Sequence, residues 1–307
     1  MNKDKIKILV CCHKKTDLPQ DVSGILFPIH VGAAISNTDL GIQRDDLLNG
    51  KPCDNISSKN CSYCELTAMY WAWKNIKKLY PNLEYIGLNH YRRYFLLNQI
   101  SFYKQLFIKK ESEIFSYGLP LKKLNRLLSD DFTIIPSRKI YAYPLAYDYA
   151  LAHHYEDLKI FVKIASEKNP KCTDVLKKHL LHNNKLSHFN MFIMKWDNFD
   201  KYCKWLFDTL EETEKYINIS NYSSVQRRIY GYMAERLLNV FCQSENLKTK
   251  YVPVVQYVNQ EDSSWLYYFY RYIRCNISNF FVRTPVLNTA WKSMIRDAEK
   301  LIKERSR

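Results

Sequence analysis

Short apolar segments of strand character alternate with segments of helical periodicity along most of this chain. The first, Ile6–Cys12, is apolar and β-branched and ends at the polar stretch HKKTDLP. Further strand-like runs follow at residues 83–88, 131–136, 189–196 and 250–255. Strands that alternate with helices are typical of an α/β domain in which helices pack against a sheet.

The helical segments lie between these runs. Apolar residues recur at helical spacing from Cys64 to Ile76, and helices are expected at 101–130, 145–168, 174–183, 197–216 and 225–246. Residues 19–54 show little periodicity and predict a loop. A strand near the N-terminus followed by a polar loop is how many nucleotide-binding α/β domains begin.

The chain is strongly basic, with a formal net charge of +15 over 307 residues. Its 47% hydrophobic content suffices for the core of one large domain. A positive field attracts nucleic acid, anionic lipid or diphosphate-bearing substrates. Because no nucleic-acid-binding module is recognised, we expect no nucleic-acid partner.

The nine cysteines point to a reducing compartment. Their number is odd, no secretory signal precedes them, and no uncharged apolar stretch of 18 residues occurs in the chain. Cys61 and Cys64 form a CxxC pair, but no second pair lies at zinc-finger spacing. We therefore expect a cytoplasmic protein with incidental thiols and no structural zinc.

Residues 261–307 differ from the rest and are expected to form a separate helical tail. Aromatic residues between Trp265 and Phe281 are interleaved with Arg271 and Arg274. Such a helix suits the headgroup layer of an anionic membrane, which would place the protein at the inner face of the cell membrane. The alternative is a helix that packs on its own domain.

A cationic cluster directly follows the strand-like run at 83–88. His90, Arg92 and Arg93 lie at its carboxyl end, where open α/β sheets carry their ligands. Arginine offers a planar fork that matches phosphate oxygens. His13 and Lys14 follow the first strand in the same way, so both groups are candidate donor-binding residues; a plain surface charge cluster is the alternative.

Other polar residues are weaker candidates. Asp54 and Asn55 could bind ribose or sugar hydroxyls. His154 and Asp157 share a helix face and could act as a base and its orienter, a metal-ligand pair, or a local hydrogen bond. Glu235 could be the general base or an ordinary salt-bridge partner. The acceptor-binding candidates are His154, Asn190 and Tyr232.

Several common motifs are absent from the sequence. There is no GxxxxGK[ST], GxGxxG, GxSxG or HExxH, and no convincing DxD of the kind that holds a divalent metal. We therefore expect no metal site, no organic cofactor and no essential divalent metal.

Four segments resemble an uncharacterised-domain family of capsular and exopolysaccharide loci: ILVCCHKK, DNISSKNCSYCELTAMYWAWKN, YIGLNHYRRYF and RRIYGYMAERLL. Its members are described as glycosyltransferases, some linked to galactofuranose transfer. The resemblance spans residues 6–256 with the motifs in the expected order. One departure is Asn89, where the family has a small or thiol residue.

The resemblance implies a GT-A-like single nucleotide-binding domain at residues 1–260, with a mixed sheet flanked by helices, before the tail at 261–307. It also implies that His90, Arg92 and Arg93 take the place of a DxD motif. The implied reaction is transfer of a hexose, with galactofuranose as the leading candidate, from a UDP-sugar to a lipid-linked glycan acceptor. We expect it to be inverting and metal-independent, with His90, Glu235 or Asp157 as catalytic residues.

Two other classes of protein remain open at this stage. Charge and aromatic content are also compatible with a nucleic-acid-modifying protein, although no such module is visible. A non-catalytic envelope-assembly scaffold, which binds lipid or nucleotide, is the other alternative. Nucleotide specificity separates the three classes.

Overall fold

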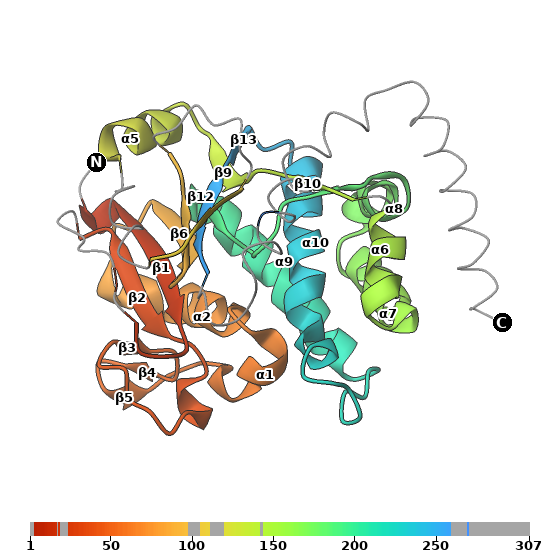
Figure 1. Cartoon of the computed structure of the whole chain (residues 1–307), viewed down its shortest axis with the longest axis horizontal. Coiled ribbons are helices and arrows are strands. Elements are labelled where there is room, and N and C mark those ends of the chain that lie inside the picture. Colours follow the sequence, from red (N-terminus) through yellow and green to blue (C-terminus); the bar gives the residue numbers. More distant parts are fainter. Residues whose placement is uncertain are drawn as a thin grey trace.

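The computed structural model describes residues 3–16, 18, 24–97, 105–110, 120–141, 144–258 and 269. Its centre is a mixed sheet with strand order β13-β9-β12-β6-β1-β2-β3 (Figure 1). These strands are β1 (Ile6–Cys12), β2 (Leu26–His30), β3 (Gln43–Arg44), β6 (Tyr85–His90), β9 (Thr133–Pro136), β12 (Phe192–Lys195) and β13 (Thr249–Val252). The sheet confirms the predicted α/β architecture.

Smaller strands complete the fold. β7 (Arg93–Phe95), β8 (Gln105–Ile108) and β14 (Val254–Tyr257) extend the sheet beside β6. Two short antiparallel pairs stand apart from it: β4 (Leu47–Leu48) with β5 (Lys51–Pro52), and β10 (Lys139–Ile140) with β11 (Lys185–Leu186).

The sheet interior explains its sequence. β1 pairs in parallel with both β2 and β6, and all seven of its residues are buried, so it is apolar throughout rather than alternating. In β6, a Cβ on Gly87 would lie 2.9 Å from the side chain of Ile193 and from the Phe192 carbonyl oxygen. Glycine therefore allows β12 to pack closely against β6.

Helices cover the sheet and extend beyond it. α9 packs on β6, β12 and α7, whereas α10 contacts α1, α8 and α9. In Figure 1, α9 and α10 lie between the sheet and the group α6–α8. The helices are α1 (Asn60–Tyr63), α2 (Leu66–Trp71), α3 (Lys77–Leu79), α5 (Leu121–Ser129), α6 (Leu145–Ala152), α7 (Tyr155–Lys168), α8 (Thr173–His182), α9 (Trp196–Glu214) and α10 (Ile229–Ser244).

The prediction of one helix over 145–168 was wrong. The chain forms α6 and α7, separated at His153 and His154, whose backbones are extended. His154 is the N-cap residue of α7, and its ring stacks on Tyr222 at 4.5 Å. Asp157 accepts a 2.8 Å hydrogen bond from the Tyr222 hydroxyl. These two candidates therefore meet at Tyr222, with His154 capping α7 and Asp157 in its first turn.

Three other expectations also need correction. Residues 105–108 form strand β8, which pairs with β14, and α5 is the helix described within 101–130. The expected loop at 19–54 contains β2 to β5; Pro28 within β2 obscured the strand pattern. The expected strand at 250–255 is divided at Pro253, so β13 pairs with β9 and β14 with β7 and β8.

The proposed tail at 261–307 lies outside the described residues apart from Phe269. Its two alternatives, a membrane-surface helix and a packed helix, stay predictions. Within the described part of the chain, no helix combines the length and apolar character needed to cross a membrane.

The topology gathers several chain segments at one edge of the sheet. Because β1, β2 and β6 are parallel, their carboxyl ends meet there. β12 runs antiparallel to β6, so the residues that precede it reach the same edge. The loop after β2 is held by Asp45, which accepts hydrogen bonds from the backbone N–H groups of Gly32 and Ala33.

Candidate active site

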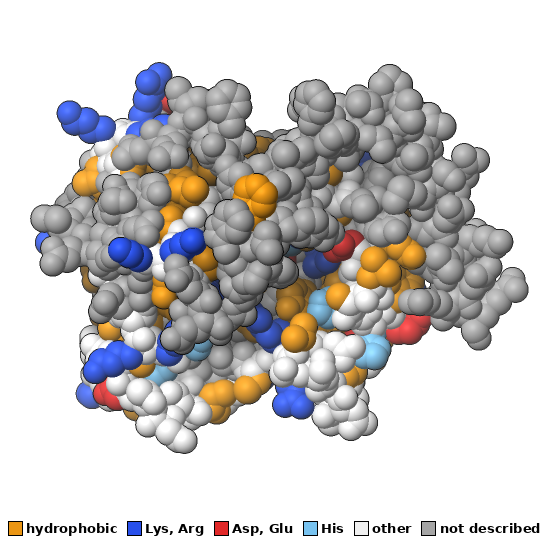
Figure 2. Space-filling view, in the orientation of Figure 1, with side chains coloured by type: hydrophobic (Ala, Val, Ile, Leu, Met, Phe, Trp, Pro, Cys, Tyr) orange, Lys and Arg blue, Asp and Glu red, His pale blue; other side chains and the backbone are white. Residues whose placement is uncertain are grey.

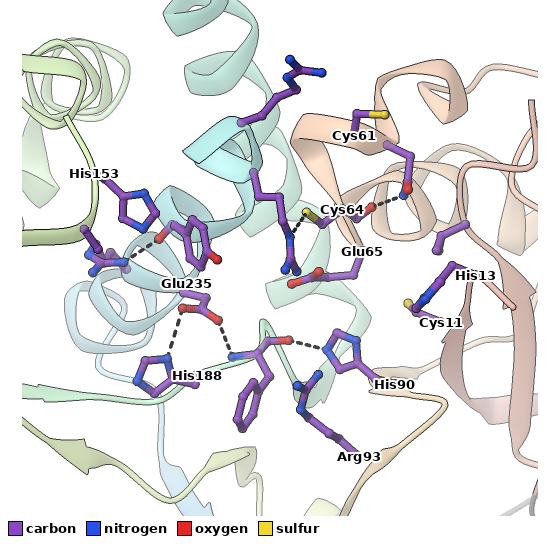
Figure 3. A pocket seen from close by; sticks show the side chains of 18 of the residues that line it. Cys11, His13, Cys61, Cys64, Glu65, His90, Arg93, His153, His188 and Glu235 are labelled. Carbon is purple, nitrogen blue, oxygen red and sulfur yellow. Dashed lines mark hydrogen bonds and ion pairs between the residues drawn. The ribbon is translucent and has the colours of Figure 1, made fainter. Parts of the chain in front are cut away.

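A cavity of about 750 Å³ lies at this edge, between the strand ends and helices α1, α6 and α10. Figure 2 shows basic side chains in the middle of this face, between the sheet and the α6–α8 helices. Figure 3 shows the lining from close by. Its lining includes Cys11, His13, Cys61, Cys64, Glu65, His90, Tyr91, Arg92, Arg93, Tyr141, Asp148, Tyr149, His153, His188, Phe189, Arg227, Arg228, Tyr232, Glu235 and Arg236.

Five arginines line the cavity: Arg92, Arg93, Arg227, Arg228 and Arg236. Within the described residues none of them has a carboxylate partner at ion-pair distance. The buried Nε atoms of Arg92 and Arg236 also lack a hydrogen-bond partner there. Burial and Arg92 lower the pKa of Arg93 to about 10, which leaves it charged at neutral pH. The lining thus holds five arginines against three carboxylates, Glu65, Asp148 and Glu235, and this positive excess favours an anion.

Four of these guanidinium groups lie over aromatic rings, Arg228 among them at 5.8 Å from the Tyr232 ring centroid. Arg93 lies 4.5 Å from the Phe189 ring centroid, and its Nε donates to the Gln256 amide oxygen at 3.2 Å. Arg236 lies 4.8 Å from the Tyr149 ring, and Arg92 lies 5.5 Å from the Tyr91 ring. Cation–π contacts fix the charge without neutralising it.

The turn before β12 carries backbone strain at the centre of the site. Phe189 and Asn190 both have left-handed backbones, with φ of 75° and 50°. For a bulky residue such as Phe189 this is a true outlier, of the kind that persists where its surroundings enforce it. The Phe189 N–H donates to Glu235 Oε1 at 2.7 Å, and its carbonyl accepts from His90 Nε2 at 2.8 Å.

Cys64 is a second strained residue in the lining, with φ 54° at the junction of α1 and α2. Its thiol accepts a hydrogen bond from Arg228 Nε at 3.2 Å, and burial raises its pKa to about 12. The other described non-glycine residues with positive φ are Asn49, Asp131, Asn190 and Asn246. The two residues that are neither Asn nor Asp, Cys64 and Phe189, therefore both face the cavity.

Two carboxylates in the cavity experience opposite environments. Burial raises the pKa of Glu65, whose Oε1 accepts a 2.7 Å hydrogen bond from Asn190 Nδ2. Burial opposes the charge of Glu235 as well, but His188 and the Phe189 N–H hold its pKa below the ordinary value. Pairs of acids whose pKa values are pushed apart are typical of catalytic sites.

His90 is a neutral side chain in this structure. Burial and the nearby Arg93 lower its pKa to about 3. Because a carbonyl oxygen can only accept, Nε2 of His90 carries the proton that it donates to Phe189. His90 therefore connects the end of β6 to the strained turn.

The structure brings six of the predicted site residues together in the cavity lining: His13, His90, Arg92, Arg93, Tyr232 and Glu235. Asn190 lies behind the wall, 1% exposed, where Nδ2 bonds Glu65 and the Gly231 carbonyl. Its position suits a support for Glu65 better than contact with an acceptor.

Five predicted site residues lie outside the lining: Lys14, Asp54, Asn55, His154 and Asp157. Asp54 accepts a hydrogen bond from the exposed Tyr70 hydroxyl. Asn55 closes a local turn through Cys53 and Ser57. His154 and Asp157 contact Tyr222, as described above, so none of these residues is retained in the proposed site.

Sequence reasoning missed several lining residues. Glu65, Tyr141, His188, Arg228 and Arg236 were not among the candidate site residues. Arg236 stood beside Glu235 in the RRIYGYMAERLL segment, which could have drawn attention to it. Tyr141 and His188 carry no local signal, because their contact joins positions 47 residues apart.

The lining offers no cluster of metal ligands. In the residues that the structure describes, no group of three or more His, Cys, Asp or Glu side chains is placed to hold a metal ion.

Comparisons with known proteins place these observations in a family. An apo structure of the bifunctional glycosyltransferase WbbM matches with a TM-score of 0.72 and 28% sequence identity, over 83% of this chain and 46% of that chain. This chain thus spans about half the length of WbbM. No curated protein matches the sequence. Residues 7–246 match the domain of unknown function DUF4422, and because this is well over half of the chain, the protein belongs to the DUF4422 family.

Proposed function

We propose that this protein is a glycosyltransferase that moves a hexose from a UDP-sugar to a lipid-linked glycan acceptor. Galactofuranose is the leading candidate for the sugar, and synthesis of a bacterial capsular or exopolysaccharide is the proposed context. The observation that carries the proposal is the cavity at the carboxyl edge of the sheet, whose five arginines have no carboxylate at ion-pair distance in the described part of the chain. The likeness to WbbM supports the class of reaction.

The arginines suit a diphosphate leaving group. When the bond from the sugar to the nucleotide breaks, negative charge grows on the diphosphate and must be stabilised. Arg92 and Arg93 are held at the strand edge by the Tyr91 and Phe189 rings, so their guanidinium groups can bind this charge as it forms. We propose that these side chains take the place that a metal ion has in other transferases, and that activity is metal-independent.

The two sides of the cavity suggest how the substrates lie. The sheet side, formed by the ends of β1, β2 and β6, is proposed to bind the nucleotide and its diphosphate. His13 lies there, with its ring 5.1 Å from the Tyr91 ring. The helix side, with Tyr149, His153 and Tyr232, is proposed to bind the acceptor through stacking rings.

The ionised Glu235 supports general-base catalysis and hence inversion at the sugar carbon. An acceptor hydroxyl needs a group to take its proton while its oxygen attacks. Of the two acids proposed from sequence, Glu235 lines the cavity and Asp157 does not.

The proposal for the basic tail at 261–307 rests on its sequence. A lipid-linked acceptor is presented at the cytoplasmic membrane face, and each basic residue near an anionic surface contributes about 1 kcal/mol. We propose that truncation after Glu261 preserves nucleotide binding and reduces flotation with anionic vesicles. Equal flotation of the full-length and truncated proteins would favour a tail packed on the domain.

Calorimetry with UDP, GDP and CMP, with and without EDTA, tests the function. We expect selective UDP binding. Arg92→Ala and Arg93→Ala should weaken this binding, whereas the control Arg126→Ala, at an exposed arginine on α5, should leave it unchanged. Activity with UDP-galactofuranose or UDP-galactose should persist in EDTA. Binding of GDP or CMP but not UDP would exclude a UDP-sugar as the donor. Activity that is lost in EDTA and restored by manganese would exclude metal independence.

A further inference from the structure

Three cavity-lining side chains form a continuous hydrogen-bonded chain. The Tyr141 hydroxyl lies 2.5 Å from His188 Nε2, and His188 Nδ1 lies 3.2 Å from Glu235 Oε2. Glu235 and His188 appear in Figure 3 with this contact drawn. Tyr141 follows β10, His188 precedes β12 and Glu235 belongs to α10, so the fold brings three separate elements to one line.

The direction of the protons in this chain follows from the chemistry of the groups. An ionised carboxylate can only accept, so Nδ1 of a neutral His188 carries the proton that it donates to Glu235. Nε2 is then the acceptor, and the Tyr141 hydroxyl donates to it. A tyrosine hydroxyl can both donate and accept, so its oxygen can receive a proton as it gives one up.

We propose that Tyr141, His188 and Glu235 form a proton relay that deprotonates the acceptor hydroxyl, an inference that rests on the proposed function. As the acceptor oxygen bonds to the sugar carbon, the bond from that carbon to the diphosphate oxygen breaks, and its electron pair leaves with the diphosphate. The acceptor proton passes to the Tyr141 oxygen while the Tyr141 proton passes to His188 Nε2. An imidazolium beside the Glu235 carboxylate results, and Tyr141 is neutral before and after.

Glu235 is better placed to act through His188 than directly. Its Oε1 accepts from the Phe189 N–H and its Oε2 from His188, and the side chain is only 11% exposed. In this role Glu235 is a positioning residue that selects the His188 tautomer and stabilises the imidazolium. Tyr141 is the catalytic residue that touches the acceptor.

Both ends of the relay are held by the backbone. The Tyr141 N–H donates to the Asn184 carbonyl at 2.9 Å, and Asn184 Nδ2 donates to the Tyr141 carbonyl at 2.9 Å. At the other end, the N–H of the strained Phe189 residue, next to His188, donates to Glu235 Oε1 at 2.7 Å. Groups held in place before substrate binds need no reorganisation during the reaction.

Polar and charged groups surround His188. Glu235 faces it from α10, and Tyr141 from the segment after β10. His90, the last residue of β6, and Arg93, the first residue of β7, contact the adjacent Phe189. The relay therefore lies beside the cationic end of β6.

Single-turnover release of UDP from UDP-galactofuranose or UDP-galactose, with octyl galactoside as the acceptor probe, tests the relay. We expect Tyr141→Phe to lower the rate about 10²–10⁴-fold with UDP affinity within about twofold of wild type. Tyr85→Phe is the matched control, since the Tyr85 hydroxyl donates to the Leu128 carbonyl and Tyr85 does not line the cavity. Glu235→Gln should lower the rate comparably, and the double variant should lose no more than the single ones.

Rates in mixtures of H₂O and D₂O separate a relay from a structural role. If two protons move together, the wild-type rate should depend on the deuterium fraction along a curve. The rate of Tyr141→Phe should depend on it along a straight line. A Tyr141→Phe rate within about fivefold of wild type, or a straight line for the wild type, overturns the relay. Failure of the wild type to bind UDP or release it from either donor instead overturns the proposed function.

Discussion

The two walls of the cavity are built in different ways. The sheet wall takes His90, Arg92 and Arg93 from four consecutive positions at the end of one strand. The opposite wall, which carries Tyr149, His153 and Tyr232 and is here named the helix wall, also takes Tyr141, His188 and Glu235. These three come from elements spread over almost a hundred residues. The first wall is made by a strand end, and the second by tertiary packing.

Both walls carry buried polar atoms without a partner among the described residues: Arg92 Nε on the sheet wall, and the Tyr149 hydroxyl, His153 Nδ1 and Arg236 Nε on the helix wall. The helix wall also holds a satisfied network, in which both oxygens of Glu235 and both ring nitrogens of His188 are hydrogen-bonded. Unsatisfied charge favours binding of an anion, whereas satisfied networks fix geometry for chemistry. We therefore expect the sheet wall to control donor affinity and the helix wall to control rate.

The largest expected effect comes from removing two arginines of the sheet wall. Each arginine contact to the diphosphate is worth about 1.5–3 kcal/mol, so Arg92→Ala combined with Arg93→Ala should lower kcat/KM about 10²–10⁴-fold. Arg93→Lys should fall between this variant and wild type, because lysine keeps the charge and loses the fork. Steady-state kinetics measure both. A double variant within tenfold of wild type would place the diphosphate elsewhere in the cavity.

The second expected effect tests the helix wall. Asn190→Ala removes the donor to Glu65 and to the Gly231 carbonyl, which should lower the free energy of unfolding by about 1–3 kcal/mol. The Asn190 hydrogen bond opposes the rise in the Glu65 pKa, so its loss should raise that pKa further. Any acid limb that Glu65 contributes to the pH–rate profile should then move to higher pH. Urea unfolding and the profile check the two parts, and an unchanged midpoint would contradict the first.

The same contrast explains how much of the molecule the sequence predicts. The strand at 6–12 and helices α8, α9 and α10 follow from local periodicity, because each buries one continuous apolar surface. The cationic cluster of His90, Arg92 and Arg93 could also be predicted, because its residues directly follow an apolar strand in the sequence. Pro28 and Pro253 concealed strand boundaries, and the contacts of Glu65 with Asn190 and of His188 with Tyr141 join distant positions. Such contacts depend on the packed fold and leave no local pattern.

A third expected effect is the pH dependence of stability, which compares one histidine from each wall. Burial lowers the pKa of His90 to about 3 and of His153 to about 4, against 6.5 for an unperturbed imidazole. Below pH 6.5 the unfolded chain binds these protons and the folded chain does not, so stability should decrease as pH falls. The decrease should end near pH 4 for His153 and near pH 3 for His90. Titration by NMR and thermal unfolding measure it; an ordinary pKa for His90 would contradict the neutral contact with Phe189.

The smallest effect is expected outside both walls. Asp54→Ala removes one hydrogen bond at an exposed tyrosine, so stability should fall by about 0.5–1.5 kcal/mol. Turnover should stay within about twofold of wild type, since substitutions away from a site change energies little. Compared at equal folded fraction, a tenfold loss of turnover would return Asp54 to the donor site.

The cysteines of the cavity make it accessible to chemical labelling. Cys11 and Cys64 are screened by burial, which raises the pKa of each thiol, whereas Cys61 is exposed at the same cavity. A thiol-reactive dye should therefore label Cys61 in preference to its two neighbours. A ligand that fills the cavity should slow this labelling, and Cys61→Ser would show how much signal the site supplies. Occupancy could then be followed before the acceptor is known.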